Sequence, residues 1–397
     1  MVTREFVITL ALAGSLGALP AHEIRSQQLS KSVLPIHLQV LFMPPPFVSE
    51  GQVALAYELY VADFRDIDVT LAQLEVLPVR DLAHPLARFT GQDLWRRVRR
   101  PGKPANLVHP ERIGGGEFAV VFLWLTLPSG QSIPQAIAHR ATFLRSMSDG
   151  SQREYVVDGA ATLIPAERPI AIRPPLPAGR WLMANGPSMF GDHRFDLQVV
   201  DGRPVDSQRF AADWMLLGPD GKLARGTPTS NTDWYGYGVP ALAIADGVVE
   251  SIGDGIPENV PLSVERAVPN RRDTVGGNYV VLRLRADVYA FYGHLQPRSL
   301  RVAVGNRVRT GQVLGLLGNS GNSDAPHLHF HLTNAGDPVS GEGIPFAFDS
   351  YTILDVLSVT EWTPMLQDNG PWLRQARARG LLRRNELPTG EAIIEFR

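Results

Sequence analysis

The first half of the chain alternates apolar and polar positions with the two-residue period of β-strands. One such strand places five side chains on a single face: Val53, Leu55, Tyr57, Leu59 and Val61. The run from Phe118 to Leu127 is almost entirely apolar, which is typical of a strand buried on both sides. Because clusters of Pro, Gly and Asp separate these short runs, residues 30–163 are predicted to form an immunoglobulin-like β-sandwich.

A proline-rich segment, residues 164–180, follows this region. Its prolines exclude a regular helix or a central strand and predict a semi-rigid, extended linker. They stand at Pro165, Pro169, Pro174, Pro175 and Pro177. We therefore expect two folding units, and we expect a fragment that starts near Ala178 to fold alone.

Residues 181–351 contain a second series of short apolar runs. Glycines such as Gly277, Gly305 and Gly321 stand between the runs and allow tight turns with positive φ. The pattern predicts a second domain built of strands, so the expected fold class is all-β. The remaining residues, 352–397, include the basic stretch PWLRQARARGLLRR, which predicts a surface helix and a tail.

The N-terminus has the pattern of a secretory signal peptide. Arg4 and Glu5 precede an uncharged apolar run from Phe6 to Pro20, and the small residue Ala21 precedes a polar stretch. We expect residues 1–21 to be removed on export, which places the mature protein in the periplasm or outside the cell, without a stable membrane span. The alternative is an uncleaved anchor, although the run is shorter than the roughly 20 residues that a span needs.

Composition narrows the function classes. The chain has 38 basic and 40 acidic residues, so it lacks the positive field with which proteins bind nucleic acid. It contains no cysteine, which excludes disulfides, thiolate zinc sites and cysteine nucleophiles. Any metal ligands must therefore be His, Asp or Glu side chains.

The most informative stretch is GNSGNSDAPHLHFHL, residues 318–332. In a strand, His327, His329 and His331 share one face, while the residues between them point into the core. Three imidazoles on one strand face are costly to bury unless they bind something, and neutral imidazole is the commonest protein ligand for zinc. The triplet therefore predicts a metal or catalytic site. The histidines of the first half are scattered and predict no site.

Several motifs together resemble one known family. The chain has YGHL at residues 292–295, a VGxxVxxGQVLG segment at 304–315 and GNSGNSxxPHLHF at 318–330. With these motifs and the segment 235–249, residues 181–351 resemble the lysostaphin-type zinc metallopeptidase domain, whose members are mostly peptidoglycan endopeptidases. The resemblance implies an antiparallel β-sheet peptidase domain that binds Zn²⁺.

The resemblance also implies roles for particular residues. His329, the second histidine of HLH, takes the place of a zinc ligand, and His327 and His294 take the places of catalytic histidines. Asp213, in QRFAADW, takes the place of the carboxylate ligand. The family carries a further histidine ligand four residues earlier, but this chain has Arg209 there, and a guanidinium cannot ligate zinc.

A displaced histidine is expected to replace the missing ligand. His193 is the nearest histidine upstream, and a branch of the family carries such a histidine before an RFAxDW segment. We therefore expect His193, Asp213 and His329 to bind one zinc. The alternatives are a site that has lost a ligand, or one in which His331 substitutes, although same-face neighbours on a strand lie about 6.6 Å apart. Relatives often carry glutamate at the position of His331, whose role stays open.

These expectations combine into one functional hypothesis. The chain is expected to be a zinc-dependent endopeptidase that cuts peptide bonds, with peptidoglycan cross-links as the expected substrate, through a metal-activated water assisted by His294 and His327. The main alternative is a catalytically silent scaffold or activator of cell-wall hydrolases. A sugar-transport phosphocarrier fits poorly, because an exported chain never meets cytoplasmic phosphate donors. The N-terminal sandwich could contact other proteins of the cell envelope.

Overall fold

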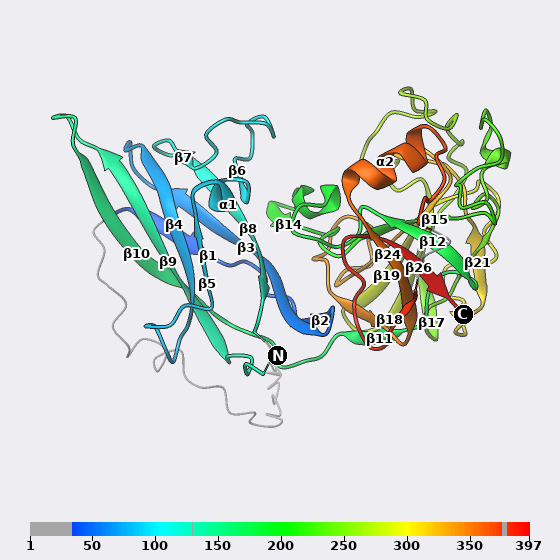
Figure 1. Ribbon diagram of the computed structural model, residues 1–397, viewed down its shortest axis with the longest axis horizontal. Helices are drawn as coiled ribbons and strands as arrows, with labels where there is room; N and C mark the ends of the chain where they lie inside the picture. Colours follow the sequence, from blue (N-terminus) through cyan, green and yellow to red (C-terminus); the bar gives the residue numbers. More distant parts are fainter. Residues whose placement is uncertain (1–33, 129, 375–378) are drawn as a thin grey trace, which may run out of the picture.

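The computed structural model describes residues 34–128, 130–374 and 379–397 (Figure 1). The expected signal peptide, residues 1–21, lies outside the described residues. Strands dominate this part of the chain, as expected, and the α-helices found in it are α1 (Gly91–Trp95) and α2 (Val359–Gln367). Short 3-10 helices lie at Asp192–Phe195 and Asn231–Asp233. No helix within the described ranges is long and apolar enough to cross a membrane.

The N-terminal half consists of two antiparallel sheets. The first has the order β1-β3-β8-β6, with β2 paired to β3; its strands are β1 (Ile36–Gln39), β2 (Phe47–Ser49), β3 (Gln52–Asp63), β6 (Val98–Arg99) and β8 (Phe118–Thr126). The second has the order β10-β9-β4-β5, with β7 paired to β4; its strands are β4 (Val69–Pro78), β5 (Ala87–Thr90), β7 (Arg112–Ile113), β9 (Ala136–Ser146) and β10 (Gln152–Leu163). Apolar side chains of both sheets form one buried cluster. The immunoglobulin-like assignment stays a prediction.

Strand β3 is buried on both faces, although its alternation predicted one buried face. Leu55 and Tyr57 point into the cluster between the two N-terminal sheets. Ala54 and Ala56, on the opposite face, belong to the main cluster of the second half of the chain. The second half therefore covers the outer face of the first N-terminal sheet. Strand β8 is also buried on both faces, as its continuous apolar run predicted.

The second half is built on one large sheet of ten strands among the described residues, in the order β20-β17-β18-β19-β22-β15-β12-β26-β24-β25. Its strands are β12 (Gly179–Ala184), β15 (Ala212–Leu216), β17 (Gly247–Gly253), β18 (Asn278–Arg285), β19 (Val288–Leu295), β20 (Arg307–Val308), β22 (Leu328–Thr333), β24 (Tyr351–Leu357), β25 (Leu381–Arg383) and β26 (Glu391–Phe396). Three small two-stranded sheets accompany it: β11 (Ile170–Ile172) with β23 (Phe346–Phe348), β13 (Gln198–Val200) with β14 (Arg203–Val205), and β16 (Pro240–Leu242) with β21 (Val313–Leu316).

The C-terminal segment differs from the expected helix and tail. Strand β26 lies between β12 and β24 in the large sheet, and its Ile393 and Ile394 are fully buried on opposite faces. Helix α2 ends at Gln367, before the basic stretch in which we expected a helix, and strand β25 lies within that stretch. Basic composition alone favours no particular element, and pairing with β24 makes residues 381–383 a strand. The limits proposed for the domains stay predictions.

The proline-rich segment is docked on the second half. Its strand β11 pairs in parallel with β23, and the Arg173 amide donates to the carbonyl of Ile244 at 2.9 Å. In turn, the Leu242 amide donates to the carbonyl of Pro175 at 2.8 Å. Leu176 belongs to the buried cluster of the second half. The segment is therefore extended, as predicted, and its course is fixed by these bonds.

An aromatic contact joins the two halves. The ring of Phe47 on β2 meets Trp124 and Phe210 edge to face, with centroids 5.1 and 5.3 Å apart. Phe47 is 1% exposed. A fragment that starts near Ala178 would leave Phe210 without this cover, which argues against the expectation that such a fragment folds alone.

We predict that Phe47→Ala lowers the free energy of unfolding by about 3–5 kcal/mol, because it leaves a cavity between Trp124 and Phe210. Urea denaturation followed by circular dichroism measures the change. Phe64→Ala is the matched control, since Phe64 is 72% exposed, and it should cost about 0.5 kcal/mol or less. Equal midpoints for the two variants would show that the contact between the halves adds nothing to stability.

Candidate metal centre and active site

Strand β22 separates the core from the site. Leu328 and Phe330 are fully buried in the main cluster, while His327, His329 and His331 line a cavity on the opposite face. This division confirms the alternation predicted from the sequence.

The neighbouring strands bring in further side chains. Strand β15 places Asp213 directly opposite His329 in the antiparallel register, so the two side chains share a face. On the other side, Gly293 of β19 lies opposite His329, and His294 follows it. Asp213 and His329 are 116 positions apart in the sequence, and the pairing of β15 with β22 makes them neighbours.

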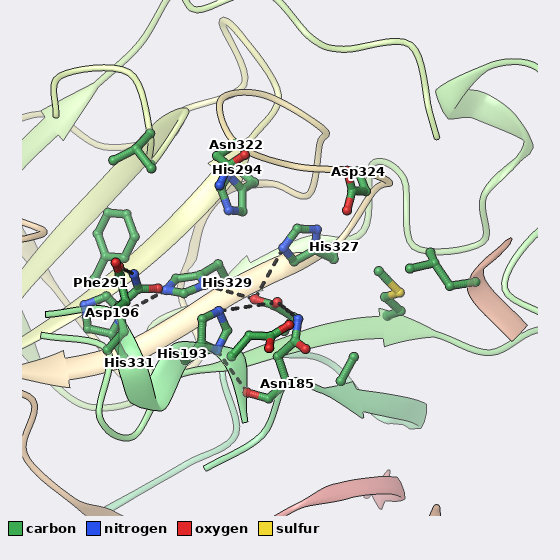
Figure 2. Close-up of a pocket in the computed structure, with 18 of the residues that line it drawn as sticks. Asn185, His193, Asp196, Phe291, His294, Asn322, Asp324, His327, His329 and His331 are labelled. Carbon is green, nitrogen blue, oxygen red and sulfur yellow. Dashed lines mark hydrogen bonds and ion pairs between the residues drawn. The ribbon is translucent and has the colours of Figure 1, made fainter. Parts of the chain in front are cut away.

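His193 reaches the same point from the 3-10 helix Asp192–Phe195. Its ring packs edge to face on that of His329, with centroids 4.8 Å apart, and its Nε2 lies 3.5 Å from Oδ2 of Asp213. One ligand atom each of His193, Asp213 and His329 lie within 4.8 Å of one another. Figure 2 shows the rings of His193, His327 and His329 converging, with His294 beyond them. The structure thus brings all five predicted site residues together, while their roles stay predictions.

Hydrogen bonds to backbone carbonyls decide which ring nitrogens carry protons. Nδ1 of His193 lies 2.9 Å from the carbonyl oxygen of Asn185. A carbonyl only accepts, so Nδ1–H of His193 donates and Nε2 faces Asp213; in the neutral ring this nitrogen carries the lone pair. Asn185 also donates from Nδ2 to Oδ2 of Asp213 at 2.9 Å. No sequence motif indicated a role for Asn185. It follows β12 with a φ of 48°, a left-handed conformation that Asn tolerates better than most residues.

His331 fixes the proton of His329 in the same way. Nε2–H of His331 donates to the carbonyl of Pro338 at 3.3 Å, so its Nδ1 is an acceptor. Burial holds the pKa of His331 well below its ordinary value, which keeps the ring neutral. His329 therefore donates from Nε2 to Nδ1 of His331 at 2.9 Å, and Nδ1 of His329 faces Oδ1 of Asp213, 2.9 Å away; in the neutral ring this nitrogen carries the lone pair.

The three groups fit a zinc ion. With both rings neutral and their other nitrogens protonated, Nε2 of His193 and Nδ1 of His329 face the Asp213 carboxylate as electron-pair donors, and a cation between them would satisfy all three groups. Ligand atoms at about 2.0–2.1 Å from a tetrahedral zinc lie about 3.3 Å apart. The contacts of Asp213 with His329 and His193, 2.9 and 3.5 Å, bracket that separation. The donor set of two imidazoles and one carboxylate leaves a fourth position open.

His294 and His327 are anchored so that Nε2 faces the cavity. Nδ1–H of His294 donates to the carbonyl of Ser320 at 2.8 Å, and Nδ1–H of His327 donates to that of Ala325 at 2.8 Å. The two ring centroids are 4.7 Å apart. His294 has a φ of 62°, in the left-handed region that side chains other than glycine seldom adopt. Its amide, which donates to the carbonyl of Gly276 at 2.9 Å, helps to hold it there.

Burial and mutual charge set the protonation of the cluster. Burial, followed by the charges of His327 and His329, holds the pKa of His294 well below its ordinary value. Burial also lowers the pKa of His329, against the effect of Asp213. For Asp213, burial acts upward, but the charges of His193 and His327 outweigh it and hold its pKa well below the usual range. The site therefore presents an ionised carboxylate beside His294, His329 and His331, whose lowered pKa values favour neutral rings. Burial also opposes the charged form of His327, but Asp213 outweighs it and raises the pKa of His327.

The histidines open into a cavity of about 740 Å³. Beyond the metal cluster, Asp196 and Gln208 line it from the segments next to β13 and β15. Trp362 and Leu366 of helix α2 also line it. The sequence assigned no site to the C-terminal segment, because nothing in its local pattern shows that α2 lies over the cavity.

Arg209 takes no part in the metal cluster. Its side chain is fully buried and forms ion pairs with Glu58 and Glu342. His193, in contrast, lies in the group of side chains that could hold a metal ion, and its role as a ligand stays a prediction.

Residues 232–340 match the family model of Peptidase family M23. A stretch of 172 residues is 31% identical to peptidoglycan DD-endopeptidase ShyA of Vibrio cholerae, covering 43% of this chain and 34% of that protein. A stretch of 110 residues is 44% identical to glycyl-glycine endopeptidase ALE-1 of Staphylococcus capitis, covering 25% of this chain and 29% of that protein. The chain thus spans about a third or less of the length of these relatives.

A solved structure with local similarity is the catalytic domain of the antimicrobial peptidase lysostaphin from Staphylococcus simulans. It is 23% identical with a TM-score of 0.20, and the match covers 31% of this chain and 84% of that one. The family match includes His294, His327 and His329, whereas His193 and Asp213 precede it. The family match and the endopeptidase names of the relatives support a hydrolase. The chain therefore contains a domain of Peptidase family M23, which includes residues 232–340.

Proposed function

We propose that this chain is a zinc-dependent endopeptidase that hydrolyses peptide bonds in peptidoglycan cross-links. The observation that carries the proposal is the convergence of ligand atoms of His193, Asp213 and His329 beside two further histidines in one cavity. The substrate class is supported by the names of the relatives, a peptidoglycan DD-endopeptidase and a glycyl-glycine endopeptidase. A wall substrate also agrees with the export expected from the N-terminus.

His193, Asp213 and His329 would hold the metal, with a net charge of +1 for the ion and its ligands. When bound there, zinc supplies a Lewis acid that polarises a carbonyl and makes water nucleophilic near neutral pH. His331 keeps the Nδ1 lone pair of His329 directed at the metal, and Asn185 does the same for Nε2 of His193. Such outer partners usually raise ligand basicity and fix orientation.

His294 and His327 would handle the protons of the reaction. Their anchored Nδ1–H groups leave both Nε2 atoms facing the cavity, close to Asp213 and His329. From there, a neutral ring can accept the proton of the attacking water at Nε2, and a protonated ring can donate a hydrogen bond from Nε2 to the carbonyl oxygen as it becomes negative. The wall formed by α2 would position the peptide beside them.

The proposal is tested by metal analysis and digestion of purified peptidoglycan with the full chain. We expect about one zinc per chain and release of peptide-containing fragments. A chelator should stop the release, and added zinc should restore it. Zinc-loaded protein that releases nothing would instead support a silent scaffold or activator, and protein without metal affinity would overturn the proposal.

We predict that His294→Ala and His327→Ala each lower the hydrolysis rate by about 10²- to 10⁴-fold while zinc stays bound, because neither side chain is a proposed ligand. His329→Ala is the comparison that should lose zinc. Zinc content and initial rates, measured on the same samples, separate variants that lose a catalytic group from variants that lose a zinc ligand. Loss of zinc from His294→Ala or His327→Ala as large as from His329→Ala would show that ligand and catalyst have been exchanged.

We predict that His193→Ala weakens zinc binding by more than about 100-fold, since even loss of an outer partner usually costs about 10- to 100-fold. Competition with a chromogenic chelator measures the affinity. His84→Ala is the matched control, because His84 is exposed and lies far from the cavity in the N-terminal half. If His193→Ala bound zinc as tightly as the control, His193 would be a loop residue and not a ligand.

A further inference from the structure

The outer face of the N-terminal sheet carries a buried carboxylate. Glu58 stands on β3 between Ala56 and Tyr60, and it is 3% exposed. Its Oε1 accepts from Nε of Arg209 at 3.0 Å, its Oε2 accepts from Nη2 of Arg209 at 2.5 Å, and Oε1 also accepts from Arg194. A carboxylate from the first half thus binds two guanidinium groups of the second half.

Both guanidinium groups belong to segments that supply proposed zinc ligands. Arg194 directly follows His193, and Arg209 lies four residues before Asp213. Arg194 also donates from Nη2 to the carbonyls of Tyr57 at 3.0 Å and Leu123 at 3.3 Å, so it is bound to the backbones of β3 and β8.

Apolar contacts hold the same loop, residues 186–196, on the N-terminal sheet. The ring of Phe195 packs edge to face on Phe122 of β8, with centroids 4.9 Å apart. The guanidinium of Arg99 lies 3.6 Å from the centroid of Phe195 on its exposed side. Met189 is buried in a cluster with Phe122 and Val120. Residues on both sides of His193 are therefore fixed by the first half of the chain.

The second half also holds the loop through side chains: Nη1 of Arg194 donates to Oδ2 of Asp206 at 2.7 Å, and the side chains of Gln198 and Gln208 donate to Asp196. Among the described residues, the loop backbone accepts one hydrogen bond from elsewhere in that half, from the Gly390 amide to the carbonyl of Pro187 at 3.0 Å. The bond between His193 and the carbonyl of Asn185 orients the ring but does not fix the loop to another strand.

Three carboxylates pair with the two arginines of this network: Glu58, Asp206 and Glu342. Burial alone would raise the pKa of the Glu58 carboxyl, but the guanidinium groups of Arg209 and Arg194 outweigh burial and lower it. Asp206 is fully buried and pairs with Nη1 of Arg194 at 2.7 Å, and burial raises its pKa against the effect of the two arginines. Glu58 contacts both Arg194 and Arg209, so its loss breaks an ion pair of each buried guanidinium.

We propose that the N-terminal sheet is part of the active site, and that Glu58 is a positioning residue that holds the loop of residues 186–196 so that His193 reaches the metal. The proposal rests on the proposed function in taking His193 as a zinc ligand. It assigns the first half of the chain a structural share in metal binding, through Arg194 on the His193 side and Arg209 on the Asp213 side.

The test compares the full chain with Glu58→Gln, with the milder Arg99→Ala and with the control Glu75→Gln. Glu75 is also a buried glutamate of the N-terminal half, but its partner, Arg88, belongs to the same half, with Nε donating at 2.7 Å. Two quantities are measured: amide hydrogen exchange of residues 186–196 in metal-free protein, and zinc affinity by chelator competition.

We expect Glu58→Gln to speed exchange in residues 186–196 and to weaken zinc binding about tenfold, the lower range for loss of an outer partner. Arg99→Ala should change the exchange rate and the zinc affinity in the same direction by a smaller factor. If Glu58→Gln does not fold, the result for Arg99→Ala tests the positioning role by itself. Glu75→Gln should leave both readings at the level of the unaltered chain.

Normal exchange and normal zinc affinity in folded Glu58→Gln and Arg99→Ala would overturn the positioning role. Faster loop exchange in Glu75→Gln, equal to that in Glu58→Gln, would also overturn it, because a general loss of stability would then explain the effect. If the unaltered chain binds no zinc, the proposed function fails, while loop exchange in metal-free protein still shows whether Glu58 positions the loop.

Discussion

The active site depends on an electrostatic conflict between three electron-pair donors. Nε2 of His193, Nδ1 of His329 and the carboxylate of Asp213 face one another, and in the neutral rings the hydrogen bonds to the carbonyls of Asn185 and Pro338 leave these two nitrogens as electron-pair donors. Lone pairs held this close repel unless a cation lies between them. The surrounding strands and loops have to maintain this arrangement, and the outer hydrogen bonds give it a single tautomer.

Alternation along strands allows the fold to maintain it. On β22, Leu328 and Phe330 anchor the strand in the core while His327 and His329 line the cavity. On β3, Leu55 and Tyr57 anchor the N-terminal sheet while Glu58 faces the other half of the chain. In both strands the packed face fixes the position of the polar face, so functional side chains move little relative to the core.

The two histidines proposed as zinc ligands are held in place by different parts of the structure. His329 stands in the middle of the large sheet with hydrogen-bonded strands on both sides. His193 stands in a short 3-10 helix whose neighbours Arg194 and Phe195 bind the other half. A ligand supplied by a loop needs outside support, and here the N-terminal sheet provides it while Arg209 is held in the same network.

Local patterns in the sequence were sufficient to predict the strands of the large sheet that carry motifs. They also predicted the shared face of His327, His329 and His331, because a period of two determines both features. The resemblance to a family suggested Asp213 and His294, and the nearest histidine upstream suggested His193. Only the tertiary structure revealed Asn185, the strands of the C-terminal segment and the wall formed by α2. It also revealed the contact of Glu58 with Arg194, 136 positions away. Such contacts depend on which sheets pack together, and no local period of apolar residues encodes the partner of a buried charge.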